Sequence, residues 1–212
     1  MNLASLGAAL LTLAFSTGCD RVLLPAAQPV YAAWEEGLTL GFEDPSLEAA
    51  LRSEKRQQVR VKESRPLGAT TLAVTKTFTT LSGQWDAQVL QKDGGVMLQP
   101  DHAPGILLLP EGFPDRVSRW EARGSCNWVV GRAAVTLPGV RLADPEGTVG
   151  VWVESITLDT GARTRTLYLP DIGEAETLTW IRGRWVTTNL LVTRGFTDVP
   201  GKAAGTSPGS SS

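Results

Sequence analysis

The chain has 212 residues, with 20 Lys and Arg, 22 Asp and Glu and one His, which gives a formal net charge of -2. This balance disfavours a nucleic-acid-binding protein, because nucleic-acid phosphates are held by clustered Lys and Arg. The hydrophobic fraction of 42% and the charged fraction of 20% are ordinary globular values, so we expect neither a disordered chain nor a multi-span membrane protein. One His and two Cys cannot supply the usual zinc sites. We therefore expect no metal and no cofactor.

The chain begins with an apolar segment, Leu3–Phe15, which is too short for a lasting transmembrane helix but has the length of the apolar part of an export signal. Small residues follow, and Cys19 comes directly after them in Ser16-Thr17-Gly18-Cys19. This pattern resembles a bacterial lipoprotein signal, which implies cleavage before Cys19 and a diacylglycerol on its thiol. The alternative is an ordinary signal cleavage at Ser16–Gly18, with Cys19 as a plain residue.

The resemblance implies that residues 1–18 are a signal peptide. It also implies that the mature protein is exported and attached to a membrane of the bacterial envelope through its N-terminal lipid, on the periplasmic or the surface face. If Cys19 carries lipid, Cys126 is the one remaining thiol, and burial is its expected state. If Cys19 carries none, a disulfide between Cys19 and Cys126 becomes an option.

Residues 19–44 mix Pro, Ala and scattered apolar residues without a sustained period, so we predict a tether. Residues 45–66 are predicted to form a short helix and a lead-in strand. Asp44 is a common N-cap residue and Pro45 suits the first helical position, so about three helical turns are expected from there. Basic residues outnumber acidic ones between Glu48 and Arg65, and we interpret this charge as a solvated face rather than as a patch for anionic headgroups.

From Gln58 onward the hydrophobic period is two, as in strands with one buried face; Leu72, Val74 and Phe78, for example, alternate with threonines. Turn signals such as Asp93-Gly94-Gly95 and Asp159-Thr160-Gly161 recur at intervals near ten residues. We therefore predict an all-β domain over residues 67–199, as an antiparallel β-sandwich, with a partly open β-barrel as the alternative. Residues 200–212 are small and polar, which predicts a disordered tail.

One hairpin is specified in detail by the segment TLTWIRGRWVTT. A two-residue loop at Arg182-Gly183 pairs Ile181 with Arg184 and places Trp180 directly opposite Trp185. Arg182 is a poor fit to a primed turn, whose first central residue has a positive φ.

Seven tryptophans stand out beside two Tyr and five Phe. Exposed indoles on a sheet can stack on sugar rings, whereas most tryptophans in a β-protein fill its core. Trp128, which follows the loop-like Arg123-Gly124-Ser125, and the pair Trp180 and Trp185 are the candidate binding surface.

Catalytic patterns are weak in this chain. His102, in a Pro-rich loop beside Asp101, could combine with Cys126 as in a thiol hydrolase, but the spacing does not favour it and we interpret His102 as a surface residue. The motifs of nucleotide-binding loops and of serine hydrolases are missing from the sequence. Carboxylates are present at the four positions Asp86, Glu121, Glu154 and Asp159, yet any β-protein of this size offers such pairs. The loop Asp144–Gly147 is interpreted as a turn rather than as a calcium site. No catalytic residue is assigned.

The sequence thus favours a lipid-anchored envelope protein whose β-domain is non-catalytic and binds a partner protein or an envelope glycan. Two alternatives remain: an enzyme acting on envelope polysaccharide or peptidoglycan, and a structural subunit of a surface assembly.

Overall fold

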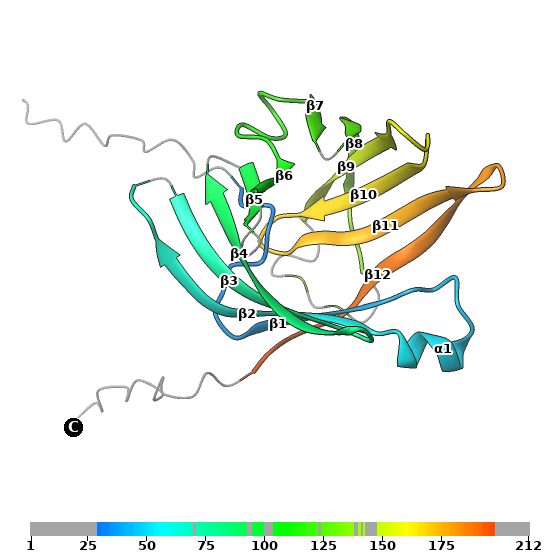
Figure 1. Ribbon diagram of the computed structural model, residues 1–212, viewed down its shortest axis with the longest axis horizontal. Coiled ribbons are helices and arrows are strands. Elements are labelled where there is room, and N and C mark those ends of the chain that lie inside the picture. Colours follow the sequence, from blue (N-terminus) through cyan, green and yellow to red (C-terminus); the bar gives the residue numbers. More distant parts are fainter. Residues whose placement is uncertain are drawn as a thin grey trace, which may run out of the picture.

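The protein folds as one antiparallel sheet of twelve strands that curls into a nearly closed barrel (Figure 1). This computed structural model describes residues 29–69, 71–92, 95–99, 104–122, 124–137, 140, 142 and 148–197. The predicted signal peptide and Cys19 therefore lie outside the described residues. So do His102, the Asp144–Gly147 loop and the predicted tail.

The strands and the one helix of the described chain occur in the following order: β1 (Leu38–Glu43), α1 (Ala49–Glu54), β2 (Gln57–Pro66), β3 (Thr71–Thr80), β4 (Gly83–Lys92), β5 (Gly95–Gln99), β6 (Ile106–Leu109), β7 (Arg119–Ala122), β8 (Ser125–Ala134), β9 (Val149–Thr157), β10 (Arg163–Leu169), β11 (Gly173–Ile181) and β12 (Arg184–Phe196). None of the helical segments in these ranges has the length and apolar character needed to cross a membrane.

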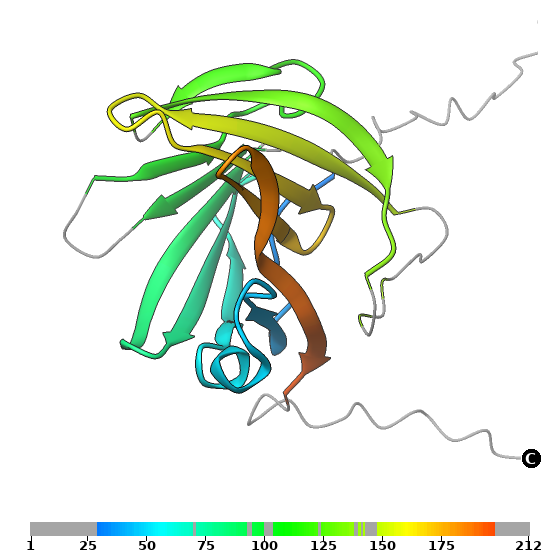
Figure 2. The same cartoon turned by 90° about the vertical axis from the view of Figure 1, so that its right-hand side faces the viewer.

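The strand order is β6-β5-β4-β3-β2-β1-β12-β11-β10-β9-β8-β7. Strands that follow one another in sequence are thus paired, except β6 and β7. The first strand, β1, pairs with the last, β12, so that these two strands lie in the middle of the sheet. The ring is open only between β6 and β7, which approach one another without forming a hydrogen-bonded pair. Figure 2 shows the strands curving around one interior.

The predicted β-sandwich is not confirmed, and the barrel alternative fits the structure. A sandwich needs two sheets that face each other without sharing a continuous set of hydrogen bonds. Here the pairing of β1 with β12 joins the two halves into one sheet. Bulges help the sheet to curve, because an extra residue bends a strand and increases its twist. They lie at Gly41/Phe42, Val61/Glu63, Val96/Met97, Val129/Gly131, Leu167/Tyr168 and Thr177/Leu178.

The N-terminal boundary of the domain differs from the prediction. Residues 29–44 were expected to belong to a tether, yet Tyr31, Ala32 and Ala33 are buried in the core and β1 is a central strand. The β-domain therefore begins well before residue 67. Close packing fixes this segment: a Cβ at Gly173 would lie 3.1 Å from the Cα of Ala32, and Gly173 also has a positive φ of 92°. No strong hydrophobic period marks residues 29–37, because their core contacts come from the three consecutive residues Tyr31, Ala32 and Ala33.

The helix of about three turns predicted from Pro45 is not formed. The Asp44 carboxylate accepts hydrogen bonds from the backbone N–H of Ser46 at 2.9 Å and from its hydroxyl at 2.5 Å. Such side-chain bonds two residues ahead stabilise a turn and compete with helix capping. The helix α1 starts later and has six residues, and its N-cap residue Glu48 makes no side-chain capping bond.

Candidate functional site

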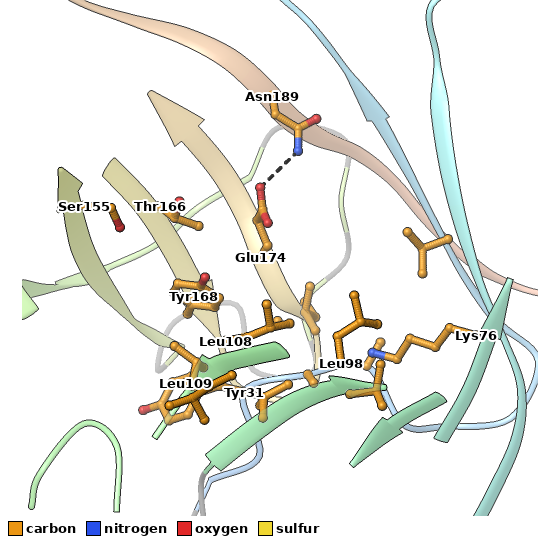
Figure 3. A pocket seen from close by; sticks show the side chains of 18 of the residues that line it. Tyr31, Lys76, Leu98, Leu108, Leu109, Ser155, Thr166, Tyr168, Glu174 and Asn189 are labelled. Atoms are coloured by element: carbon orange, nitrogen blue, oxygen red, sulfur yellow. Dashed lines mark hydrogen bonds between the residues drawn. The ribbon is translucent and has the colours of Figure 1, made fainter. Parts of the chain in front are cut away.

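The inner face of the barrel encloses a cavity of about 510 Å³ (Figure 3). The strands β1–β6 supply a mostly apolar wall that includes Phe42, Val59, Phe78, Val89 and Leu98. The strands β8–β12 supply a wall of hydroxyl, amide and carboxylate groups, among them Asn127, Ser155, Thr166, Glu174 and Asn189. The cavity is therefore amphipathic, and its lining reaches both β6 and β7 at the open seam.

Lys76 is the charged residue that the described part of β1–β6 contributes to this mostly apolar wall. It lies on β3 between Val74 and Phe78, and its side chain is directed into the cavity (Figure 3). Only 7% of its surface is exposed, and it forms no hydrogen bond or ion pair with any other described residue. Burial disfavours the charged ammonium and lowers the pKa of Lys76 from 10.5 to about 8. A cation without a partner among the described residues thus faces the interior of the barrel.

Sequence reasoning missed Lys76, although the signal was present. The alternation of β3 assigns Leu72, Val74 and Phe78 to the buried face, and position 76 belongs to the same face by parity. A lysine at a buried-face position is unusual, because lysine is almost never fully buried without a partner.

The polar wall is held together by its own hydrogen bonds. Glu174 accepts one from the hydroxyl of Thr177 at 2.6 Å and one from the amide of Asn189 at 3.3 Å. On the neighbouring strands, the Ser155 hydroxyl donates to the Asn127 side-chain oxygen at 2.6 Å. This wall is therefore preorganised, and it presents polar groups across the cavity from Lys76.

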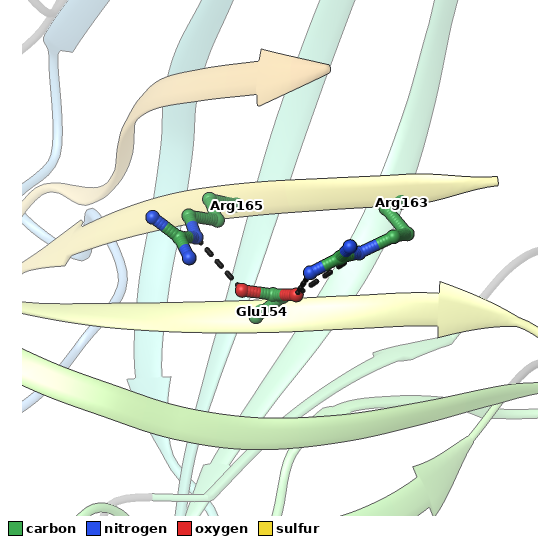
Figure 4. Close-up of polar contacts among 3 residues, drawn as sticks. All are labelled: Glu154, Arg163 and Arg165. Carbon is green, nitrogen blue, oxygen red and sulfur yellow. Dashed lines mark hydrogen bonds and ion pairs between the residues drawn. The ribbon is translucent and has the colours of Figure 1, made fainter. Parts of the chain in front are cut away.

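A second cluster lies on the outer face of the same strands (Figure 4). Because Ser155 and Thr164 line the cavity, their neighbours Glu154 and Arg163 point outward. Glu154 accepts hydrogen bonds from Arg163 at 2.5 Å and from Nε of Arg165 at 2.8 Å. Burial of this carboxyl, which is 3% exposed, opposes ionisation, but the hydrogen bonds and charges of the two arginines outweigh burial and lower the pKa of Glu154.

Two indoles complete this cluster. Trp180 pairs with Trp185 across the β11–β12 hairpin, and Ile181 pairs with Arg184, as predicted. The rings of the two tryptophans are 5.1 Å apart in an edge-to-face arrangement. The guanidinium of Arg165 lies 4.5 Å from the centre of the Trp185 ring, and that of Arg163 lies 5.5 Å from the Trp180 ring. We call Glu154, Arg163, Arg165, Trp180 and Trp185 the outer cluster.

The other tryptophans are distributed around the molecule. Trp128, on β8, pairs with Glu154 on β9. It is half-buried and lies on the same outer face as the cluster. Trp152 shares that face but packs against the core, and Trp120 lies inside against Phe113, with ring centres 5.8 Å apart. Trp85 is exposed and stacks on Phe78 in the other half of the sheet.

The residues considered for catalysis are not assembled in the described chain. Cys126 is a half-buried free thiol 3.6 Å from a carboxylate oxygen of Glu121. Asp86 accepts hydrogen bonds from Lys62 and Thr77, both at 2.7 Å, and these bonds lower its pKa. Asp86 on β4 and Glu154 on β9 belong to different halves of the strand order. Within the described ranges, no three His, Cys, Asp or Glu side chains are grouped as metal ligands would be.

Comparison with known proteins identifies a fold. No protein-family model matches the chain, and no curated protein is significantly similar to it in sequence. A crystal structure from Bacteroides fragilis, described as a "putative exported protein with YmcC-like fold", is similar with a TM-score of 0.50 and 11% identity, over 79% of this chain and 99% of that one. A "putative lipoprotein" from Parabacteroides distasonis gives a TM-score of 0.45 at 11% identity, with the same coverage. At this identity the first likeness shows the fold alone.

Proposed function

We propose that this chain is a lipid-anchored cell-envelope protein, attached through Cys19, whose barrel is a non-catalytic module that binds an envelope glycan at the outer cluster. The lipoprotein-like signal supports the location, and the protein of similar fold from Bacteroides fragilis is described as a "putative exported protein". The outer cluster supports the binding role.

The observation that carries this proposal is the state of Arg165 and Trp180. Arg165 is 37% exposed and uses only Nε toward Glu154, so its two terminal nitrogens have no hydrogen-bond partner among the described residues. Trp180 is 40% exposed and packs on Trp185, the ring that the Arg165 guanidinium contacts. A sugar ring can pack against an indole while a guanidinium binds a carboxylate or phosphate substituent. An acidic glycan therefore fits the cluster better than a neutral one.

A partner protein is the second occupant that this surface suits, because Trp and Arg are the residues enriched at the energetic centres of protein interfaces. The enzyme and the structural subunit remain alternative hypotheses. No specific observation on the described residues favours either of them.

The anchoring part of the proposal is tested by intact mass. The membrane-extracted protein is expected to begin at Cys19 and to carry added acyl mass, and a Cys19→Ser variant is expected to carry no acyl mass. A mature chain that begins at another residue, or that lacks lipid mass, would contradict anchoring without affecting the binding proposal.

The binding part is tested with acidic and neutral polysaccharides from bacterial envelopes, using calorimetry on the mature protein. A Trp180→Ala, Trp185→Ala double variant is expected to lose binding by about tenfold or more, because each stacked ring contributes on the order of 1 kcal/mol. Trp85→Ala is the matched control, since it removes an exposed, stacked indole from the other half of the sheet. Equal affinity in all three proteins would remove the outer cluster from consideration.

A further inference from the structure

The cavity of the barrel is a separate site from the outer cluster, and Lys76 is its central feature. The Lys76 side chain is more than nine-tenths buried, yet it has no partner among the described residues. The residues paired with Lys76 on the two adjacent strands are Val61 on β2 and Ala87 on β4. A buried cation is ordinarily paired or neutralised, because removing a charge from water is costly. Something that enters the cavity could supply the missing negative charge.

The size and lining of the cavity define the rest of such a ligand. Its volume of about 510 Å³ is in the range of about 300–1,000 Å³ that is typical of small-molecule sites. Around Lys76 the wall is formed by Val59, Phe78, Val89 and Leu98, which suit a hydrocarbon body. The lining also includes Leu107 and Leu108 on β6 and Ala122 on β7, so the seam strands border the cavity.

We propose that the barrel binds a single-chain anionic amphiphile, whose carboxylate or phosphate pairs with the Lys76 ammonium and whose aliphatic chain packs on the apolar wall of β2–β6. The hydroxyl and amide groups of Ser155, Thr166 and Asn189 face the other side of the ligand, where they can bind hydroxyl groups or water.

Other ligand classes fit the cavity less well. A neutral hydrocarbon would leave the ammonium of Lys76 unpaired in an even drier surrounding. A metal cation would be repelled by the ammonium. A neutral sugar would bury hydroxyl groups against the apolar wall without hydrogen-bond partners. An anionic amphiphile satisfies both the charge and the apolar surface.

The experiment compares three ten-carbon probes: decanoate, decyl phosphate and the neutral 1-decanol. The protein is the mature chain, residues 19–212, with Cys19→Ser, so that it carries neither the apolar signal segment nor lipid. Calorimetry is expected to show decanoate or decyl phosphate binding at least about tenfold more tightly than 1-decanol, because a charge-assisted hydrogen bond is added. The stronger of the two anions distinguishes a carboxylate ligand from a phosphate one.

Two variants assign the effect to Lys76. Lys76→Met keeps a long unbranched side chain without the charge, so it is expected to remove the preference for the anions while 1-decanol binds as before. Lys62→Met is the matched control, because Lys62 lies on the neighbouring strand β2 but pairs with Asp86 on the exterior. It is expected to keep the preference.

The pH dependence gives an independent measurement on the unmodified site. With a pKa of about 8 in the empty cavity, Lys76 loses its charge at higher pH, so decanoate affinity is expected to fall by about tenfold between pH 7 and pH 9.5. Glu174, Tyr31 and Tyr168 also line the cavity, and any pH dependence that persists in Lys76→Met belongs to them. Equal affinity for decanoate, decyl phosphate and 1-decanol, or no binding of any of the three, would overturn the proposal. Since no step involves the outer cluster, failure here leaves the glycan hypothesis intact.

Discussion

Lys76 is held in the folded protein at a cost in free energy. A lysine whose pKa is lower in the folded than in the unfolded state binds its proton less tightly after folding. The difference between 10.5 and about 8 corresponds to about 3 kcal/mol at neutral pH, where the residue is charged in both states. A side chain kept at such a cost is consistent with a functional role, because perturbed pKa values cluster at functional sites.

Replacing Lys76 by Met is therefore expected to stabilise the protein at pH 7, by about 1–3 kcal/mol. The unfolded state binds more protons than the folded state between pH 8 and 10.5, so wild-type stability rises with pH in that window relative to the variant. The advantage of the variant should thus shrink above pH 8 and vanish above about 10.5. Urea unfolding of both proteins at several pH values measures it, and a difference that stays constant up to pH 10.5 would contradict the burial of an ionisable amine.

Glu154 has the opposite linkage, because its pKa is lowered on folding. The stability that it contributes is present above its ordinary pKa of 4.5 and is lost as the pH falls through the lower folded value. Glu154→Gln is expected to cost about 1–3 kcal/mol at pH 7, since hydrogen bonds to charged groups contribute about that much. In acid the two proteins should converge in stability. Thermal unfolding from pH 7 downward checks this, and Glu121→Gln, at an exposed carboxylate, is a suitable control.

The elements of the sheet were predicted to different degrees, for reasons that lie in particular residues. The alternation of residues 71–79 specified β3, and the segment around Arg182-Gly183 specified the register of the β11–β12 hairpin. The closure of the sheet was not predictable, because the pairing of Leu40 with Arg194 joins strands at opposite ends of the chain without a local signal. Two residues of the predicted binding surface, Trp180 and Trp185, lie together in this hairpin. Their contacts with the guanidinium groups of Arg163 and Arg165 depend on the pairing of β10 with β11, whose register was not predicted from the sequence.

The turn of this hairpin contains a residue under local strain. Arg182 has φ 49° and Gly183 has φ 82°, as in a type I′ turn, which favours Asn-Gly. The left-handed region costs an ordinary side chain about 1–2 kcal/mol and Asn less. Arg182→Asn is therefore expected to stabilise the protein by about 0.5–1 kcal/mol in urea unfolding. Arg184→Asn is the control, because it removes the same charge outside the turn. An equal gain in stability in this variant would mean that the loss of charge, and not the relief of backbone strain, causes the effect.

In the molecule as a whole, the first and last strands of the chain lie in the middle of the sheet, and strands from the middle of the sequence form its two edges. The terminal strands β1 and β12 each have two hydrogen-bonded neighbours, whereas β6 and β7, near the middle of the sequence, each have one. Chain ends usually fray first, but here the free edges of the sheet are internal segments. The seam between β6 and β7 is also where the lining of the cavity meets the edge of the sheet. The free edges of the sheet and the border of its cavity thus coincide.

Hydrogen exchange of backbone amides should show this arrangement directly. We expect amides of Ile106–Leu109 and Arg119–Ala122 to exchange at least about tenfold faster than those of Leu38–Glu43 and of the central part of β12, because an edge strand opens without breaking a second set of strand pairs. Decanoate bound in the cavity should slow exchange in β6, whose Leu107 and Leu108 line it, and leave the β11–β12 hairpin loop at Arg182-Gly183 unchanged. Exchange in β1 and β12 as fast as in β6 and β7 would contradict the closed pairing of the two terminal strands, since it would place the opening of the barrel between them.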